Sequence, residues 1–268
     1  MLDDGDGKNA EKDYSVEKRN YRLRLSARWP LEKDRLPIWG MFGMAVPLRS
    51  SHDTIRSRYA HPFPTTVHVE LTNDCNLECP MCARTTSMIR PVQHMPDEMF
   101  CRLVDEIQDK GVEKLFLHHF GESLMHPHAY ELIKYAARKK RVGRVSLSTN
   151  VTTLNKKNAH RLLKTSLHHL TLSVDADTQD VYKVVRGFDF DRTLDNARGF
   201  LRQHRDYGSK MHVTLLIINM GIKRHEIESF KRSWEPYVSP RVKILVKKMT
   251  NYGGAVDTVQ FSGGEIDA

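Results

Sequence analysis

Three cysteines, Cys75, Cys79 and Cys82, follow one another in a C-x3-C-x2-C spacing. Thiolates are soft ligands that select iron–sulfur clusters or zinc. Three of them leave one coordination position open, whereas a structural zinc site is closed by four protein ligands. An incomplete zinc site and buried structural cysteines are the other interpretations, but Cys101 is the one further cysteine available to complete a tetrad. The spacing therefore predicts a metal centre with a free position for chemistry.

Polar residues that suit a charged ligand follow later apolar runs of the chain. Gly121 and Glu122 combine a residue that permits close backbone approach with a carboxylate that accepts hydrogen bonds from an ammonium group. Arg186 offers a planar fork for a carboxylate. In the alternative interpretation, Ser173 and Asp175 cap a following helix and Arg186 is an ordinary surface charge.

The cysteine loop and the segments after it resemble the radical S-adenosylmethionine (SAM) enzymes, most of all the core domain of SPASM/Twitch-type members, from about residue 67 to about residue 249. The resemblance implies a [4Fe–4S] cluster on Cys75, Cys79 and Cys82, with SAM chelating the open iron. It also implies reductive cleavage of SAM to a 5′-deoxyadenosyl radical, which abstracts hydrogen from a substrate.

The same resemblance suggests which residues contact SAM. Gly121 and Glu122 match the end of a Gly-Gly-Glu segment that contacts the amino group, although Phe120 replaces the first glycine. Ser173 and Arg186 match the positions that hold the methionyl carboxylate.

Two further contacts are expected on the same basis. Ser148 ends an apolar run and is a candidate for the ribose or carboxylate of SAM. Met81 stands where relatives commonly carry an aromatic side chain near adenine, and its adaptable apolar side chain can cover a base. No residue is assigned a catalytic role.

The resemblance favours a peptide, or a sugar- or aminoglycoside-like small molecule, as the substrate, and an external one-electron donor such as flavodoxin or ferredoxin. Modification of a nucleotide or RNA is the alternative within enzymes, and the formal charge of +9 is compatible with it, although a solvated basic surface is the better explanation of the charge. A non-enzymatic iron–sulfur or zinc-binding module is the alternative outside enzymes.

Composition favours a cytoplasmic protein with one sizeable core. The chain has 268 residues, of which 40% are hydrophobic. Four cysteines, three of them in one loop, do not form a disulfide framework. The start of the chain lacks the pattern of a secretory signal, and no apolar run is long enough to span a membrane.

The elements that must position these residues alternate between strands and helices. Strands are expected at residues 66–71, 114–118, 145–148, 169–174, 212–218 and 242–246, and helices at 96–109, 128–139 and 155–164. This alternation predicts an α/β protein with parallel strands and right-handed crossovers. Six units match the partial (β/α)6 TIM-like barrel that the resemblance implies, whereas a full barrel needs eight.

Three regions are expected along the chain. Residues 1–64 form an N-terminal extension, residues 65–250 the radical SAM core, and residues 251–268 a C-terminal tail. The tail contains no cysteine, so the chain is expected to hold one cluster only. Either the protein is a compact variant, or the tail begins an auxiliary-cluster extension that this chain does not include.

Overall fold

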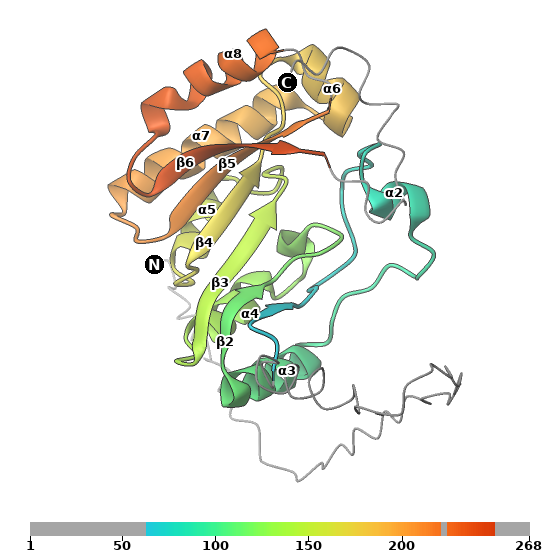
Figure 1. Cartoon of the computed structure of the whole chain (residues 1–268), viewed down its shortest axis with the longest axis vertical. Helices are drawn as coiled ribbons and strands as arrows, with labels where there is room; N and C mark the ends of the chain where they lie inside the picture. The colour runs from blue at the N-terminus through green and yellow to red at the C-terminus, as the bar shows by residue number, and fades with distance from the viewer. Residues whose placement is uncertain (1–62, 221–223, 250–268) are drawn as a thin grey trace, which may run out of the picture. The chain divides into compact units, whose positions relative to one another are not determined.

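One parallel sheet organises the residues described by this computed structural model, which are residues 63–220 and 224–249. Its six strands lie in chain order, and every neighbouring pair is parallel (Figure 1). The strands are β1 (Thr66–His68), β2 (Val112–Phe116), β3 (Val142–Thr149), β4 (His169–Ser173), β5 (His212–Asn219) and β6 (Val242–Lys248). Parallel neighbours need crossover connections, which the helices supply.

The helices of the described residues alternate with these strands. They are α2 (Ala83–Ser87), α3 (Asp97–Lys110), α4 (Ala129–Ala137), α5 (Lys156–Leu163), α6 (Gln179–Arg186), α7 (Phe190–Asp206) and α8 (Arg224–Trp234), with short 3₁₀ turns η1 (Ser123–Met125) and η2 (Glu235–Tyr237). In Figure 1, α5, α7 and α8 lie along one side of the sheet. None of the helices in the described ranges is long and apolar enough to cross a membrane.

Helix α3 shows why the sequence folds locally as it does. Asp97 sits in the first turn, where a carboxylate favours the helix dipole, and Gly111 ends the helix with a φ of +83°. Phe100, Val104 and Ile107 recur at helical spacing and are buried in the core.

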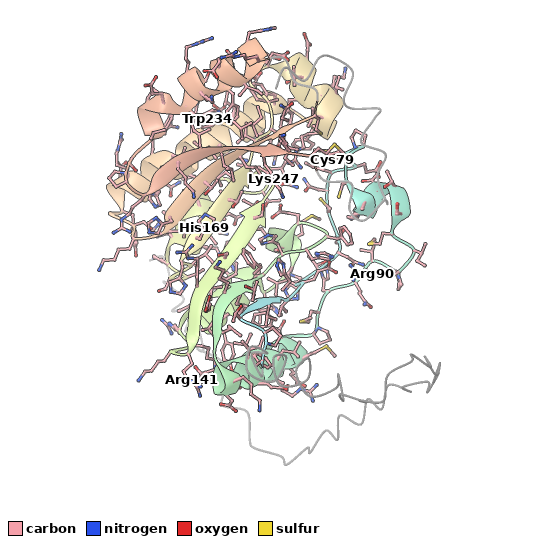
Figure 2. The ribbon with its side chains drawn as sticks, in the orientation of Figure 1. Cys79, Arg90, Arg141, His169, Trp234 and Lys247 are labelled. Atoms are coloured by element: carbon pink, nitrogen blue, oxygen red, sulfur yellow. The ribbon has the colours of Figure 1, made fainter. Side chains whose placement is uncertain are left out.

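The two faces of the sheet differ in chemistry. Successive strand residues point to opposite faces, and one face is apolar and packs against the helices. It includes Leu147, Leu170, Leu172, Val213 and Leu215. Trp234 of α8 lies on this helical side (Figure 2). The other face carries hydroxyl side chains in register across three strands: Ser148, Thr171 and Thr214.

The predicted α/β class and partial barrel of six parallel strands are confirmed. Most predicted strands shift by only a few residues at their ends, but β1 ends at His68 rather than at residue 71. The segment after it still donates one hydrogen bond to the sheet, from Val69 N–H to the Phe116 carbonyl at 2.8 Å. Residues 1–62 of the expected extension and the expected tail lie outside the described residues, so the proposed division of the chain stays a prediction.

Candidate functional site: a three-cysteine centre at the carboxyl ends of the strands

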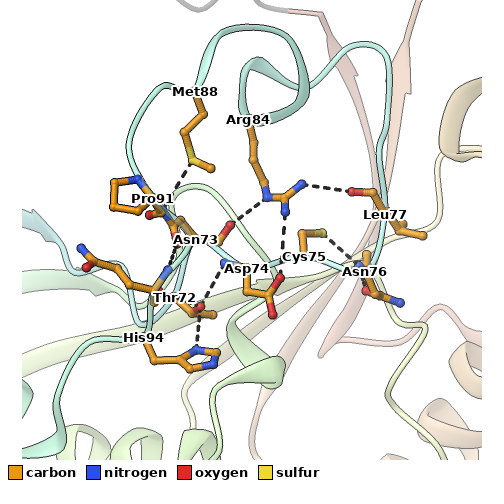
Figure 3. Close-up of polar contacts among 12 residues, drawn as sticks. Thr72, Asn73, Asp74, Cys75, Asn76, Leu77, Arg84, Met88, Pro91 and His94 are labelled. Carbon is orange, nitrogen blue, oxygen red and sulfur yellow. Dashed lines mark hydrogen bonds and ion pairs between the residues drawn. The ribbon is translucent and has the colours of Figure 1, made fainter.

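The cysteine loop leaves the carboxyl end of β1 and is held at its start by Asn73. The Asn73 amide nitrogen donates to the Pro91 carbonyl at 2.8 Å, and its amide oxygen accepts the Gln93 backbone N–H at 2.7 Å. Asn73 is fully buried. These bonds tie the loop to the segment that returns after α2 (Figure 3), so both ends of the loop are anchored.

Arg84 of α2 holds the start of the cysteine loop through hydrogen bonds to its backbone carbonyls. Its Nε donates to the Asn73 carbonyl at 2.7 Å and its Nη1 donates to the Leu77 carbonyl at 3.5 Å (Figure 3). The Asp74 carboxylate lies 4.0 Å from Nη2 of the same guanidinium. One side chain therefore bridges the backbone on both sides of Cys75.

Two of the three thiols face nitrogen donors from distant strands and helices. Cys79 is buried, whereas Cys75 and Cys82 are partly exposed. Asn150 Nδ2 donates to Cys75 Sγ at 3.7 Å, and Arg186 Nη1 donates to Cys79 Sγ at 3.5 Å. Such outer hydrogen bonds orient and tune metal-bound thiolates.

The donor set fits a cluster of several irons. Burial raises the pKa of Cys75 to about 11 and also raises that of Cys79, so both thiols keep their protons at neutral pH until a metal displaces them. Among the residues that the structure describes, no three Cys, His, Asp or Glu side chains gather closely enough to hold a single metal ion. In a cubane cluster each of three cysteines binds a different iron, so three thiols on one loop, two of them facing N–H donors, match the ligand set of such a cluster.

Gly121 is required where the loop after β2 meets the cysteine loop. Its φ is +74°, a conformation that glycine adopts without strain. A β-carbon here would lie 2.6 Å from the Asp74 carbonyl oxygen and closer still to that of Thr72. The structure shows a close approach of this glycine to the chain just before Cys75, whereas the predicted approach to a ligand stays a prediction.

Glu122 joins three loops of the site. Its N–H donates to the Asp74 carbonyl at 2.7 Å, while its carboxylate accepts the backbone N–H groups of Leu124 at 3.1 Å and Asn150 at 2.7 Å. Burial raises the pKa of Glu122, and these two N–H donors oppose that effect. The carboxylate thereby positions Asn150, whose amide donates to Cys75.

Two serine hydroxyls meet beside a neutral histidine. Ser148 Oγ and Ser173 Oγ are 3.4 Å apart at the ends of β3 and β4. His118 Nδ1 accepts the Ser148 backbone N–H at 3.1 Å, and burial lowers the pKa of His118 to about 4. This imidazole is therefore neutral, with its proton on Nε2. The adjacent His119 is exposed, as expected for neighbours that point to opposite faces.

The alternative interpretation of Ser173, Asp175 and Arg186 is wrong. Helix α6 is capped by Thr178, whose hydroxyl accepts the Val181 N–H at 3.4 Å. Asp175 is instead completely buried and forms an ion pair with Arg186, whose side chain is 11% exposed. Arg186 is thus an interior residue of the site and not a surface charge.

Met81 lies inside the cysteine loop and is 5% exposed. It belongs to a small apolar cluster formed by Leu77, Cys79, Met81 and Val185. The side chain therefore packs in the interior beside Cys79, and its predicted contact with adenine stays a prediction.

Cys101 lies on the core face of α3 and is 5% exposed, away from the loop. We expect Cys101→Ala to retain the iron content of the unaltered protein, because a lone helical cysteine acts as a small buried hydrophobe. Loss of its packing should lower the free energy of unfolding by about 1 kcal/mol. Iron analysis and urea unfolding check both statements, and a loss of iron would contradict the assignment of Cys101 to the core.

Two anchoring residues, Asn73 and Arg84, were not singled out from the sequence. The available signal was their position, since Asn73 lies two residues before Cys75 and Arg84 two residues after Cys82. Polar side chains so close to a metal-binding loop commonly satisfy its exposed backbone groups.

The molecule is thus an α/β protein whose three-thiol loop follows the first strand of a parallel sheet, at the edge where such folds place their functional groups. The model of the Radical SAM superfamily matches residues 69–233, so the chain belongs to that superfamily of enzymes. Members bind a [4Fe–4S] cluster and SAM, and the donor set described above fits this cluster.

Curated relatives match about half of the chain. The subtilosin biosynthesis protein AlbA of Bacillus subtilis is 32% identical over 143 residues, which cover 52% of this chain and 31% of AlbA. The AdoMet-dependent heme synthase of Methanosarcina barkeri is 30% identical over 135 residues, which cover 49% of this chain and 37% of the synthase. The chain thus spans about a third of the length of these relatives.

Among solved structures, Streptococcus suis SuiB bound to SAM has a similar fold. The TM-score is 0.62 at 16% identity, and the match covers 76% of this chain and 45% of SuiB.

Proposed function

We propose that this chain is the core of an enzyme that cleaves SAM reductively and abstracts hydrogen from its substrate. The observation that carries the proposal is the set of Cys75, Cys79 and Cys82 at the carboxyl ends of the strands, with N–H donors to two of the sulfurs. When bound, the [4Fe–4S] cluster and SAM together supply the 5′-deoxyadenosyl radical. The chain's own residues anchor the cluster, orient SAM and shape the cavity for the substrate.

We assign the SAM carboxylate to Ser173 and Arg186. Arg186 Nε is buried and has no hydrogen-bond partner among the described residues, so a donor is left for a ligand. Ser148, whose hydroxyl lies beside that of Ser173, is assigned to the ribose or carboxylate.

Gly121 and Glu122 are assigned to the amino group of SAM. The carboxylate of Glu122 already accepts two backbone N–H groups, so its remaining lone pairs would serve the ligand. Met81 is assigned to the apolar surroundings of the adenine.

A peptide is the substrate class that we favour, because relatives near 30% identity include AlbA, named for bacteriocin biosynthesis, and a PqqA peptide cyclase from Streptomyces rochei. A small molecule is the second candidate, supported by the similarity to the heme synthase. Nucleotide or RNA modification rests on charge alone.

An external one-electron donor such as flavodoxin or ferredoxin completes the proposal. A cytoplasmic location belongs to it as well, because all four cysteines are free and such thiols suit a reducing compartment.

Anaerobic reconstitution with iron and sulfide, followed by incubation with SAM and dithionite, tests the proposal without knowledge of the substrate. We expect about four irons per chain, as for one [4Fe–4S] cluster, and 5′-deoxyadenosine detectable by mass spectrometry. A fully assembled cluster that yields no 5′-deoxyadenosine would overturn the proposed reaction, whereas failure to bind iron would overturn the site itself.

A further inference from the structure

Asp175 lies two residues after the end of β4, and both oxygens of its carboxylate have partners. It is completely buried and has a φ of +61°, in the left-handed region that few residues other than glycine adopt and that aspartate tolerates better than most. One carboxylate oxygen accepts the Ile218 N–H at the end of β5 at 2.7 Å, and the other is paired with Arg186. The carboxylate therefore fixes the guanidinium relative to two strands.

Arg186 is the last residue of α6 and points back toward the cysteine loop. Gly187 ends the helix with a φ of +66°, so the chain turns away directly after Arg186. Burial alone would lower the pKa of Arg186, but the Asp175 carboxylate and the Cys79 sulfur outweigh it and hold the pKa above its ordinary value. The side chain is a permanent cation with one nitrogen on a cluster ligand.

We propose that Arg186 tunes the reduction potential of the cluster through its hydrogen bond to Cys79, and that Asp175 is the positioning residue that aims the guanidinium at this sulfur. The inference rests on the proposed function, because it concerns the same three-cysteine site. The reduced cluster carries one more electron than the oxidised one, and an N–H donor on a ligand sulfur stabilises that added negative charge. Arg186 thus makes the cluster easier to reduce before SAM is bound.

The test is an EPR-monitored redox titration of the reconstituted protein in the absence of SAM, so that a lost contact to SAM cannot contribute. For Arg186→Gln we expect the ratio of reduced to oxidised cluster at one fixed potential to fall about tenfold, which for a one-electron couple corresponds to about 59 mV. Arg186→Lys keeps the charge without the planar fork, so its ratio of reduced to oxidised cluster should lie between those of the unaltered protein and Arg186→Gln. Lys183→Gln removes an exposed cation from the same helix and should leave the potential unchanged.

Asp175→Asn separates positioning from simple electrostatics, because the two predict opposite signs. Removing an anion near the cluster would by itself raise the potential, whereas a guanidinium that is no longer aimed at Cys79 lowers it. We expect Asp175→Asn to have a lower reduction potential than the unaltered protein. The double variant with Asp175→Asn and Arg186→Gln should have a potential no lower than that of Arg186→Gln alone.

The outcomes distinguish this inference from the proposed function. The tuning role would be overturned if Arg186→Gln had the same reduction potential as the unaltered protein, or if Asp175→Asn had a higher one. Neither result would affect the formation of 5′-deoxyadenosine by the unaltered protein. If Arg186→Gln assembles too little cluster to titrate, Arg186→Lys decides, since its potential must then fall below that of the unaltered protein. An unaltered protein without a cluster would overturn the proposed function instead.

Discussion

A chain in which Cys75, Cys79 and Cys82 are all replaced by alanine is expected to retain only background iron after anaerobic reconstitution and to form no 5′-deoxyadenosine. No other cysteine lies in the loop, and Cys101 is buried in the core face of α3. Without thiolates the remaining groups are harder oxygen and nitrogen donors, which do not hold such clusters in this setting. Iron and sulfide analysis, the visible spectrum and mass detection of 5′-deoxyadenosine measure the loss.

Cys101→Ala is the matched control, since it removes the same chemical group from the core face of α3. The urea unfolding midpoints of both variants show whether the fold persists. Retention of about four irons per chain by the triple variant would refute the metal site, because that is the content of one [4Fe–4S] cluster.

Gly121→Ala is expected to destabilise the protein by roughly 2–4 kcal/mol, which combines the strain of a left-handed backbone with overpacking. The added β-carbon would collide with carbonyl oxygens of Thr72 and Asp74, which cannot move without displacing the start of the cysteine loop. Iron uptake should fall along with stability. Urea unfolding and iron analysis under identical conditions measure the two effects.

Gly208→Ala is the control that measures the strain of a left-handed backbone without overpacking. Gly208 has a similar φ of +62°, but nothing lies within 4 Å of a β-carbon placed there. We expect a cost of about 1 kcal/mol and unchanged iron content. Equal destabilisation by both substitutions would show that Gly121 does not depend on its contact with the cysteine loop.

The sheet was predictable because its strands are short apolar runs separated by amphipathic helices. The ends of the strands were harder to predict, because they depend on where backbone pairing with the neighbouring strand stops. β2 begins at Val112, two residues before the predicted start, because Gly111 ends α3 immediately before it. β1 ends early, and the backbone beyond it pairs elsewhere, since the Leu71 carbonyl accepts the Met95 N–H at 2.8 Å.

The spacing of the three cysteines is enough to propose them as ligands, which stays a prediction, but the hydrogen-bond donors to their sulfurs could not be predicted. Asn150 reaches Cys75 across 75 positions of the sequence, and Arg186 reaches Cys79 across 107. Such contacts exist only after the strands pair, so local patterns cannot reveal them. The same holds for the contact of Glu122 with Asn150: Glu122 is predicted to contact a ligand, and in the structure its carboxylate accepts the backbone N–H groups of Leu124 and Asn150.

The separation between Cys79 and Arg186 has a consequence for biosynthesis. A ribosome adds about 5–20 residues per second, so on the order of 5–20 s pass between the synthesis of the cysteine loop and that of its guanidinium partner, 107 residues later. During this interval the nascent Cys79 thiol lacks Arg186, and the Cys75 thiol lacks Asn150 until the 75th residue after it has been added. Oxidants that act on nascent chains would therefore lower the yield of protein able to accept a cluster, although the completed fold buries Cys79.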